Sequence, residues 1–217
     1  MKWDRVALLV LNEELNDPIM ADEAQYYIRR YNISDHLIVT INRPVEQFLH
    51  DRKGISVGSQ LAAMNSVLAG KLTCQSKIII MAHGALPPER TCSGLDAVLM
   101  ARLLQLLGVT DVGLISFKSC YTGLDSYLGE FTVACKSNNI RFGWCLAYID
   151  ISTLTWIHPV TGKIRYLKRQ VIGEREDADF LEYFASKGTR KAPDADRVRV
   201  VKGTPGLPGA APRNTRQ

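Results

Sequence analysis

The sequence predicts an α/β fold in three layers, with a mostly parallel central sheet that helices cover on both faces. Short apolar runs alternate with longer segments in which apolar residues recur at helical spacing, which is typical of consecutive β-α-β units. Several apolar runs are uninterrupted, such as KIIIM at residues 77–81, and strands of that kind are buried on both faces. The chain has 217 residues, which is enough for one domain with a substantial core.

The first part of the chain predicts three strands and two helices. The strands are short runs of mostly β-branched or large apolar residues, and Pro44 follows the second one too closely for that strand to continue. The second helix has Leu61, Met64 and Val67 at helical spacing. In chain order, the predicted elements are a strand at 6–11, a helix at 20–31, a strand at 36–41, a helix at 57–72 and a strand at 77–81.

The next part predicts two further helices, each followed by a strand. Ser93 and Asp96 have the spacing of a capping box, and Gly108 suits the end of the helix that follows them. In chain order, the predicted elements are a helix at 95–107, a strand at 112–117, a helix at 126–138 and a strand at 141–148.

A β-hairpin is predicted after this series, and we call it the flap (about residues 153–169). The segments 153–157 and 163–169 alternate in the manner of strands, and the residues between them include a Pro and a Gly that suit a turn. Trp156 and Tyr166 are expected to lie across the hairpin from each other, where they would pack.

The rest of the chain predicts a short amphipathic helix at 177–187 and a tail. From residue 203 onward Pro and Gly are frequent and little can be buried, so we expect disorder there. The expected organisation is therefore one domain at 1–202, which includes the flap, and a tail at 203–217.

The net charge of +5 is unevenly placed. Residues 158–217 hold 13 basic and 7 acidic side chains, so this segment carries +6 and the first 157 residues carry −1. A protein that binds nucleic acid usually spreads Lys and Arg over a folded face, so the pattern disfavours nucleic acid as a partner. A basic nucleic-acid-binding protein remains the second alternative to the function inferred below.

The composition also limits the cellular setting and the cofactors. Five cysteines occur in no C-x-x-C spacing, which indicates neither a disulfide framework nor a zinc site, and no other metal site is predicted. No run approaches the ~20 apolar residues that span a bilayer. The N-terminal apolar run lacks the features of a signal peptide. We therefore expect a cytoplasmic protein with reduced thiols.

Two reactive side chains directly follow neighbouring strands of the predicted sheet. His83 and Gly84 come after the strand at 77–81, and Cys120 comes after the strand at 112–117. If the helix between them is a right-handed crossover, the two strands are parallel, and their carboxyl ends lie side by side. Ligands bind at such strand ends in open α/β sheets.

A thiol beside an imidazole is the arrangement that a cysteine nucleophile needs, because the thiolate is the reactive form. We predict that Cys120 is the nucleophile and that His83 exchanges its proton. The backbone amides of Gly84 and Cys120 would form an oxyanion hole. Each residue alone is more often structural, since Cys is commonly a small buried apolar residue, and the prediction rests on their matched placement.

The two motifs resemble the caspase-like clan of cysteine peptidases. Apolar strand, His-Gly, crossover helix, apolar strand and then SCYTG at 119–123 follow the order of the catalytic blocks in that clan, and SCYTG is similar to the SCHSG of metacaspases. The short spacing between His83 and Cys120 looks most like the autoprocessing cysteine protease domains of RTX and large clostridial toxins. The resemblance implies a caspase-like topology, a cysteine endopeptidase that needs no cofactor for its chemistry, and a protein or peptide substrate.

The same resemblance implies a ligand for the local positive charge. The toxin domains are activated by inositol hexakisphosphate, which binds a basic pocket beside a flap. Lys163, Arg165 and Arg169 fall on one side of the second flap strand and Lys168 on the other, so these four residues are the candidates for binding an inositol phosphate. The alternative is a solvated cationic strand that discourages edge-to-edge aggregation.

The resemblance leaves the substrate preference open. In the clan, the strand and loop after the nucleophile build the substrate pocket, which points to Trp144, Leu146 and Asp150. Asp150 would favour a basic residue before the cleaved bond, whereas Trp144 and Leu146 would favour an apolar one.

The toxin domains cut a linker that precedes them, but here only five residues precede the first strand, so we expect a free-standing protease that acts on another protein. The resemblance to toxins also implies an effector that reaches a host cytosol without a cleavable signal peptide. The first alternative function is an inactive caspase-like module that docks a partner as an adaptor.

Overall fold

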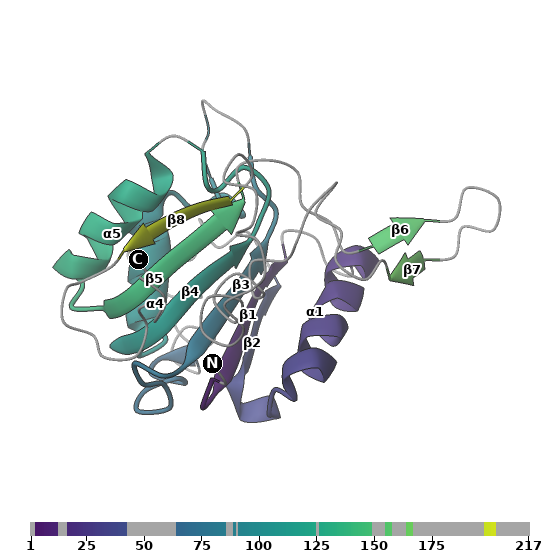
Figure 1. The fold of residues 1–217 in the computed structure, drawn as a ribbon, viewed down its shortest axis with the longest axis horizontal. Coiled ribbons are helices and arrows are strands. Elements are labelled where there is room, and N and C mark those ends of the chain that lie inside the picture. Colours follow the sequence, from purple (N-terminus) through teal and green to yellow (C-terminus); the bar gives the residue numbers. More distant parts are fainter. Residues whose placement is uncertain are drawn as a thin grey trace, which may run out of the picture.

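A computed structural model describes nine stretches of the chain and shows an α/β fold (Figure 1). The described residues are 3–12, 17–42, 64–85, 89, 91–124, 126–148, 155–157, 164–166 and 198–202. Among them, six strands form one sheet in the order β2-β1-β3-β4-β5-β8, and two more form a separate pair. Their bounds are β1 (Val6–Asn12), β2 (Ile38–Asn42), β3 (Lys77–Ala82), β4 (Asp111–Lys118), β5 (Arg141–Tyr148), β6 (Thr155–Ile157), β7 (Ile164–Tyr166) and β8 (Val198–Lys202).

The first five strands of the sheet are parallel, as the sequence predicted. The chain adds β2 on one side of β1 and then adds β3, β4 and β5 in succession on the other side. The strand order therefore reverses between β1 and β3, and this switch point is where open parallel sheets bind ligands. At the far edge, β8 pairs antiparallel with β5; this strand was not predicted.

Three α-helices connect the parallel strands in the described part of the chain, namely α1 (Pro18–Tyr31), α4 (Ala97–Leu106) and α5 (Tyr127–Ser137). Asp17 caps α1 by accepting hydrogen bonds from the backbone amides of Ile19 and Met20, and Pro18 occupies the first helical position. Helix α1 packs against β1 and β3, whereas α4 and α5 pack against each other.

Neighbouring residues of β4 show how the sheet is covered. The ring of Phe117 meets the rings of Tyr127 and Phe131 of α5 edge to face, with centroids 6.0 and 5.2 Å away. The next side chain, Lys118, lies against Tyr27 of α1. Because side chains alternate along a strand, α5 and α1 contact side chains that leave the strand in opposite directions. Nearly every residue of β1, β3 and β4 is buried, which is why these strands read as continuous apolar runs.

The structure corrects the prediction of a capping box before the helix at 95–107. Helix α4 begins at Ala97, and Asp96 is its N-cap, since the Asp96 carboxylate accepts from the amide of Leu99. Ser93 instead donates from its hydroxyl to the carbonyl of Leu11 at 3.1 Å. The sequence pattern located the helix start within two residues but assigned the cap to the wrong side chain.

Two further predictions are corrected. The helix predicted at 57–72 does not reach its expected end, because residues 65–71 form turns in which Ser66 and Gly70 have positive φ angles; residues 57–63 lie outside the described part. The flap strands β6 and β7 pair antiparallel as predicted, but Trp156 lies opposite Arg165, and Tyr166 lies opposite Thr155. The predicted helix at 177–187 and the tail at 203–217 lie outside the described residues.

Candidate functional site

The two sequence motifs follow adjacent parallel strands. The register ends with Met81 of β3 opposite Lys118 of β4, so His83 and Cys120 each come two residues after the last paired position. His83 also lies at the switch point, since β3 is the strand that follows the reversal of strand order.

Gly84 touches the backbone of Cys120. A Cβ atom built on Gly84 would lie 1.7 Å from the carbonyl oxygen of Cys120 and 2.8 Å from Oγ of Ser119. No side chain can occupy that space, so only glycine permits the two chain segments to come this close. Ser119 is buried, and its hydroxyl has no hydrogen-bond partner among the described residues.

Residues 91–95 hold the His83-Gly84 segment from the other side. The amide of Ser93 donates to the carbonyl of His83 at 2.7 Å, and the amide of Ala85 donates to the carbonyl of Thr91 at 3.0 Å. Gly84 and Cys92 thus face each other as a pair that shares no hydrogen bond in a short antiparallel bridge. In such a pair the N–H and C=O groups of each residue point away from the partner, which directs those of Gly84 away from Cys92.

A tight turn follows Cys120. Tyr121 has a φ of 58°, in the left-handed region that side chains rarely adopt, and the amide of Gly123 donates to the carbonyl of Tyr148 at 2.6 Å. The chain therefore reverses immediately after Cys120 and is fixed to the end of β5. Strained turns of this kind are common where a reactive side chain must stand clear of a sheet.

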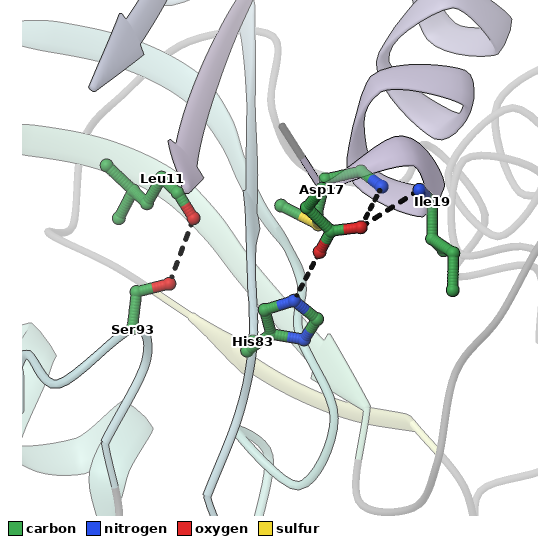
Figure 2. Close-up of polar contacts among 6 residues, drawn as sticks. Leu11, Asp17, Ile19, His83 and Ser93 are labelled. Carbon is green, nitrogen blue, oxygen red and sulfur yellow. Dashed lines mark hydrogen bonds and ion pairs between the residues drawn. The ribbon is translucent and has the colours of Figure 1, made fainter. Parts of the chain in front are cut away.

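Asp17 hydrogen-bonds to His83, and the sequence analysis did not identify this residue. Nε2 of His83 lies 2.8 Å from Oδ2 of Asp17, while Oδ1 of the same carboxylate accepts from the amides of Ile19 and Met20 (Figure 2). The imidazole is about half exposed, and the carboxylate is mostly covered. The carboxylate thus caps α1 and orients His83 at the same time.

The contacts of Asp17 determine its pKa. Burial by itself would raise this pKa, but the hydrogen bonds from His83 and from the amides of Met20 and Ile19 outweigh that effect and hold the pKa below its usual value. Asp17 is therefore a carboxylate at neutral pH and favours the imidazole tautomer that carries its proton on Nε2. The second ring nitrogen of His83, Nδ1, is then an acceptor.

Two buried lysines lie between the sheet and α1. Nζ of Lys118 donates to the hydroxyl of Tyr148 at 3.1 Å and lies 5.3 Å from the ring centroid of Tyr27. Near the other end of the sheet, Nζ of Lys77 donates to the hydroxyl of Tyr31 at 3.2 Å and lies 4.8 Å from the centroid of that ring. Aromatic faces and phenol oxygens stabilise the two ammonium groups away from bulk water.

The remaining cysteines differ from Cys120 in their surroundings. All five cysteines are thiols, and Cys92, Cys135 and Cys145 are completely buried. Burial raises the pKa of Cys135 to about 12 and that of Cys145 well above its usual value. These two thiols are therefore inert core side chains, whereas Cys120 and Cys74 are partly exposed.

The other predicted site residues lie in β5 or β7, or outside the described part. Leu146 is fully buried within β5, and Trp144 packs against the core from the same strand; Asp150 is not among the described residues. Of the four candidate inositol-phosphate ligands, Arg165 lies in β7, and Lys163, Lys168 and Arg169 lie outside the described residues.

The sequence matches no protein-family model and shows no significant similarity to a curated protein. Within the described residues, no helix combines the length and apolar character needed to cross a membrane. The same residues contain no group of three or more His, Cys, Asp or Glu side chains arranged to hold a metal ion.

Proposed function

We propose that the protein is a cysteine endopeptidase in which Cys120 is the nucleophile and His83 exchanges its proton. The observation that supports this most directly is that three features meet at the carboxyl ends of two central strands. His83 is oriented by Asp17, Gly84 lies against the backbone of Cys120, and both follow adjacent parallel strands. A thiol, an oriented imidazole and backbone N–H donors for the oxyanion are the groups that acyl transfer requires.

The proposed reaction begins when Sγ of Cys120 attacks the carbonyl carbon of the cleaved peptide bond. Nδ1 of His83 accepts the thiol proton, and Asp17 stabilises the resulting imidazolium through Nε2. The amides of Gly84 and Cys120 bind the developing oxyanion; the direction of the Gly84 N–H, away from Cys92, supports this role.

His83 then gives its proton to the leaving amine, and a thioester remains on Cys120. A water molecule attacks the thioester carbonyl and loses a proton to His83. Collapse of the second tetrahedral intermediate releases the acid product and returns the proton to the thiol. Every proton in this cycle passes through one imidazole, so the orientation that Asp17 imposes acts on both halves of the reaction.

The finer fold assignment belongs to the same proposal. The connection through α1 joins β1 to β2, which lies on one side of β1 in the sheet. The connections through α4 and α5 add β4 and β5 in the opposite direction. Because such crossovers are right-handed, α1 lies on one face of the sheet and α4 and α5 on the other, which gives three layers. The contacts of Lys118 with α1 and of Phe117 with α5 support this arrangement. We propose that this three-layer arrangement has a caspase-like topology.

The test is a peptide-library digestion with the wild type, Cys120→Ala and Cys74→Ala. We expect cleavage by the wild type and by Cys74→Ala, because Cys74 is the other partly exposed thiol and lies away from the site. Cys120→Ala should lose all cleavage, because it removes the thiol that attacks the peptide bond in the proposed reaction. Cleavage that persists in Cys120→Ala would contradict the proposal. A wild type that cleaves nothing but captures a partner protein would favour an inactive docking module instead.

A further inference from the structure

A groove with a volume of about 830 Å³ lies between the neighbouring helices α4 and α5. Val98 of α4 and Val133 of α5 line it, and they are 44% and 67% exposed. No other large apolar side chain is exposed in the part of the chain that the structure describes. Apolar side chains scattered singly over a surface need no explanation, but two that share one groove indicate a surface for a partner.

Gly129 widens the same groove, and no contact inside the chain requires a glycine there. It lies in the first turns of α5, and a Cβ atom built on it would meet nothing within 4 Å. Alanine is the better residue for a helix, because glycine loses more conformational freedom when the helix forms. The missing side chain leaves space that the surface of another chain can fill.

Two side chains of opposite charge line the groove as well, Arg102 of α4 and Glu130 of α5. Both are exposed. Glu130 accepts a hydrogen bond from the hydroxyl of Ser126, and neither charged group forms an ion pair with another described residue. A surface that holds one cation, one anion and two exposed apolar groups is complementary in charge to a second copy of itself.

Hydrogen bonds at both ends of the helices define their relative positions. The hydroxyl of Tyr127 donates to the carbonyl of Leu95 where the helices begin, and Nε2 of Gln105 donates to the carbonyl of Asn138 where they end. The two helices are therefore parallel, and residues 32 or 33 positions apart in the chain lie at about the same level.

This register places Val98 level with Glu130, and Arg102 level with the residue that follows Val133. The two valines are therefore diagonal to each other across the groove, and so are the two charges. A two-fold axis along the line between the valines brings each valine to its own copy and each cation toward the anion of the other chain. We propose that this groove is the interface of a homodimer, in which Arg102 pairs with Glu130 of the partner subunit.

The size of the face predicts a weak dimer. Helices of this length extend about 15 Å and pack about 10 Å apart, so each copy offers much less than the roughly 800 Å² per partner of a stable complex. We expect a Kd on the order of 100 μM. The monomer then predominates in assays at a few micromolar, and the dimer forms where the chain is concentrated.

The test is analytical ultracentrifugation of the full chain from about 1 μM to about 1 mM, with a reductant that keeps the thiols free. We expect the average mass to rise toward twice that of the monomer. Val133→Asp should weaken association about tenfold or more, because it places a carboxylate in the interface. Arg102→Glu and Glu130→Arg should each raise the Kd about tenfold, because each turns two attractive pairs into repulsive ones. Lys136→Glu is the matched control; it reverses a charge of α5 outside the groove and should leave the Kd unchanged.

An equimolar mixture of Arg102→Glu and Glu130→Arg tests the pairing between copies. The first variant is acidic at both positions and the second is basic at both, so the mixture should dimerise about as tightly as the wild type although neither variant does so alone. All the substituted side chains are exposed, and thermal unfolding at low concentration checks that each variant folds.

A wild type that stays monomeric up to the highest concentration would overturn the inference. A dimer that Val133→Asp does not weaken would also overturn it, as would a mixture of the two charge variants that does not recover association. The inference does not depend on Cys120. Cleavage that persists in Cys120→Ala would contradict the proposed function and leave the dimer interface intact.

Discussion

At the scale of single residues, the carboxylate of Asp17 performs two tasks that substitutions can separate. Asn is as good an N-cap as Asp, so Asp17→Asn keeps the cap of α1 but loses the charge that orients His83. We expect kcat/KM to fall about 100-fold with little change in the melting temperature. Asp17→Ala should lower both, because it also removes the cap. Peptidase assays with thermal unfolding distinguish the two; equal activity in the wild type and Asp17→Asn would show that the contact does not orient the base.

The lowered pKa of Asp17 also predicts how stability responds to acid. A carboxyl whose pKa is lower in the folded than in the unfolded chain stabilises the fold above its unfolded pKa, about 3.9, and this contribution is lost as the pH falls through the folded value. We therefore expect the free energy of unfolding of the wild type to fall relative to that of Asp17→Asn as the pH drops below about 4. Urea unfolding across that pH range measures the difference. If the free energies of unfolding of the two proteins depended on pH in the same way, the pKa of Asp17 would not be linked to stability.

Sequence patterns revealed one partner of the His83–Asp17 contact but not the other. His83 and Cys120 stand directly after apolar strands, so chain position alone singled them out. Asp17 followed by Pro18 is a recognisable helix start, and it could have been identified as a cap. Its second bond, to a histidine 66 residues away, depends on where α1 lies over the sheet, and local pattern does not contain that information.

At the scale of elements, the close approach of two strand ends depends on Gly84. We expect Gly84→Ala to destabilise the fold by about 1–3 kcal/mol and to abolish cleavage, because the new methyl group must displace the backbone of Cys120. Gly129→Ala is the control, since its Cβ would meet nothing within 4 Å in α5, where Ala is the better helix former by about 1 kcal/mol. The melting temperature should fall for Gly84→Ala and rise for Gly129→Ala. A Gly84→Ala variant that still cleaved peptides would show that cleavage does not depend on the close contact between Gly84 and Cys120.

The elements that sequence periodicity predicted best are those whose burial is uniform. Strands β1, β3 and β4 are buried along nearly their full length, so an apolar run marks them without ambiguity. Strand β8, with the sequence VRVVK, mixes charged and apolar residues over only five positions and pairs at the sheet edge. Its placement beside β5 depends on partner residues 50 to 58 positions earlier in the chain. Short edge strands of this kind are specified by tertiary pairing more than by their own sequence.

At the scale of the whole molecule, positive charge and proposed chemistry occupy different parts of the chain. The segment from residue 158 onward carries a net +6, while the proposed catalytic groups belong to the nearly neutral first 157 residues. Strand β6 of the flap contacts α1, the helix that Asp17 caps (Figure 1). A ligand bound to the flap could therefore act on the orientation of His83 through α1 without touching the reacting atoms.

We predict that a compact polyanion is the ligand of this charged segment, with inositol hexakisphosphate as the probe. Clustered cations hold several phosphates together, and a ligand at 100 times its Kd stabilises a fold by about 2.7 kcal/mol. The melting temperature of the full chain should therefore rise with millimolar probe, and less so in Arg165→Gln. Arg141→Gln is the control, because Arg141 pairs with Asp111 at the opposite end of the sheet and should leave the rise unchanged. A melting temperature that did not change with inositol hexakisphosphate would contradict this prediction, as would an equal rise with sulfate at matched ionic strength. Either result would indicate that the basic segment is a solvated surface.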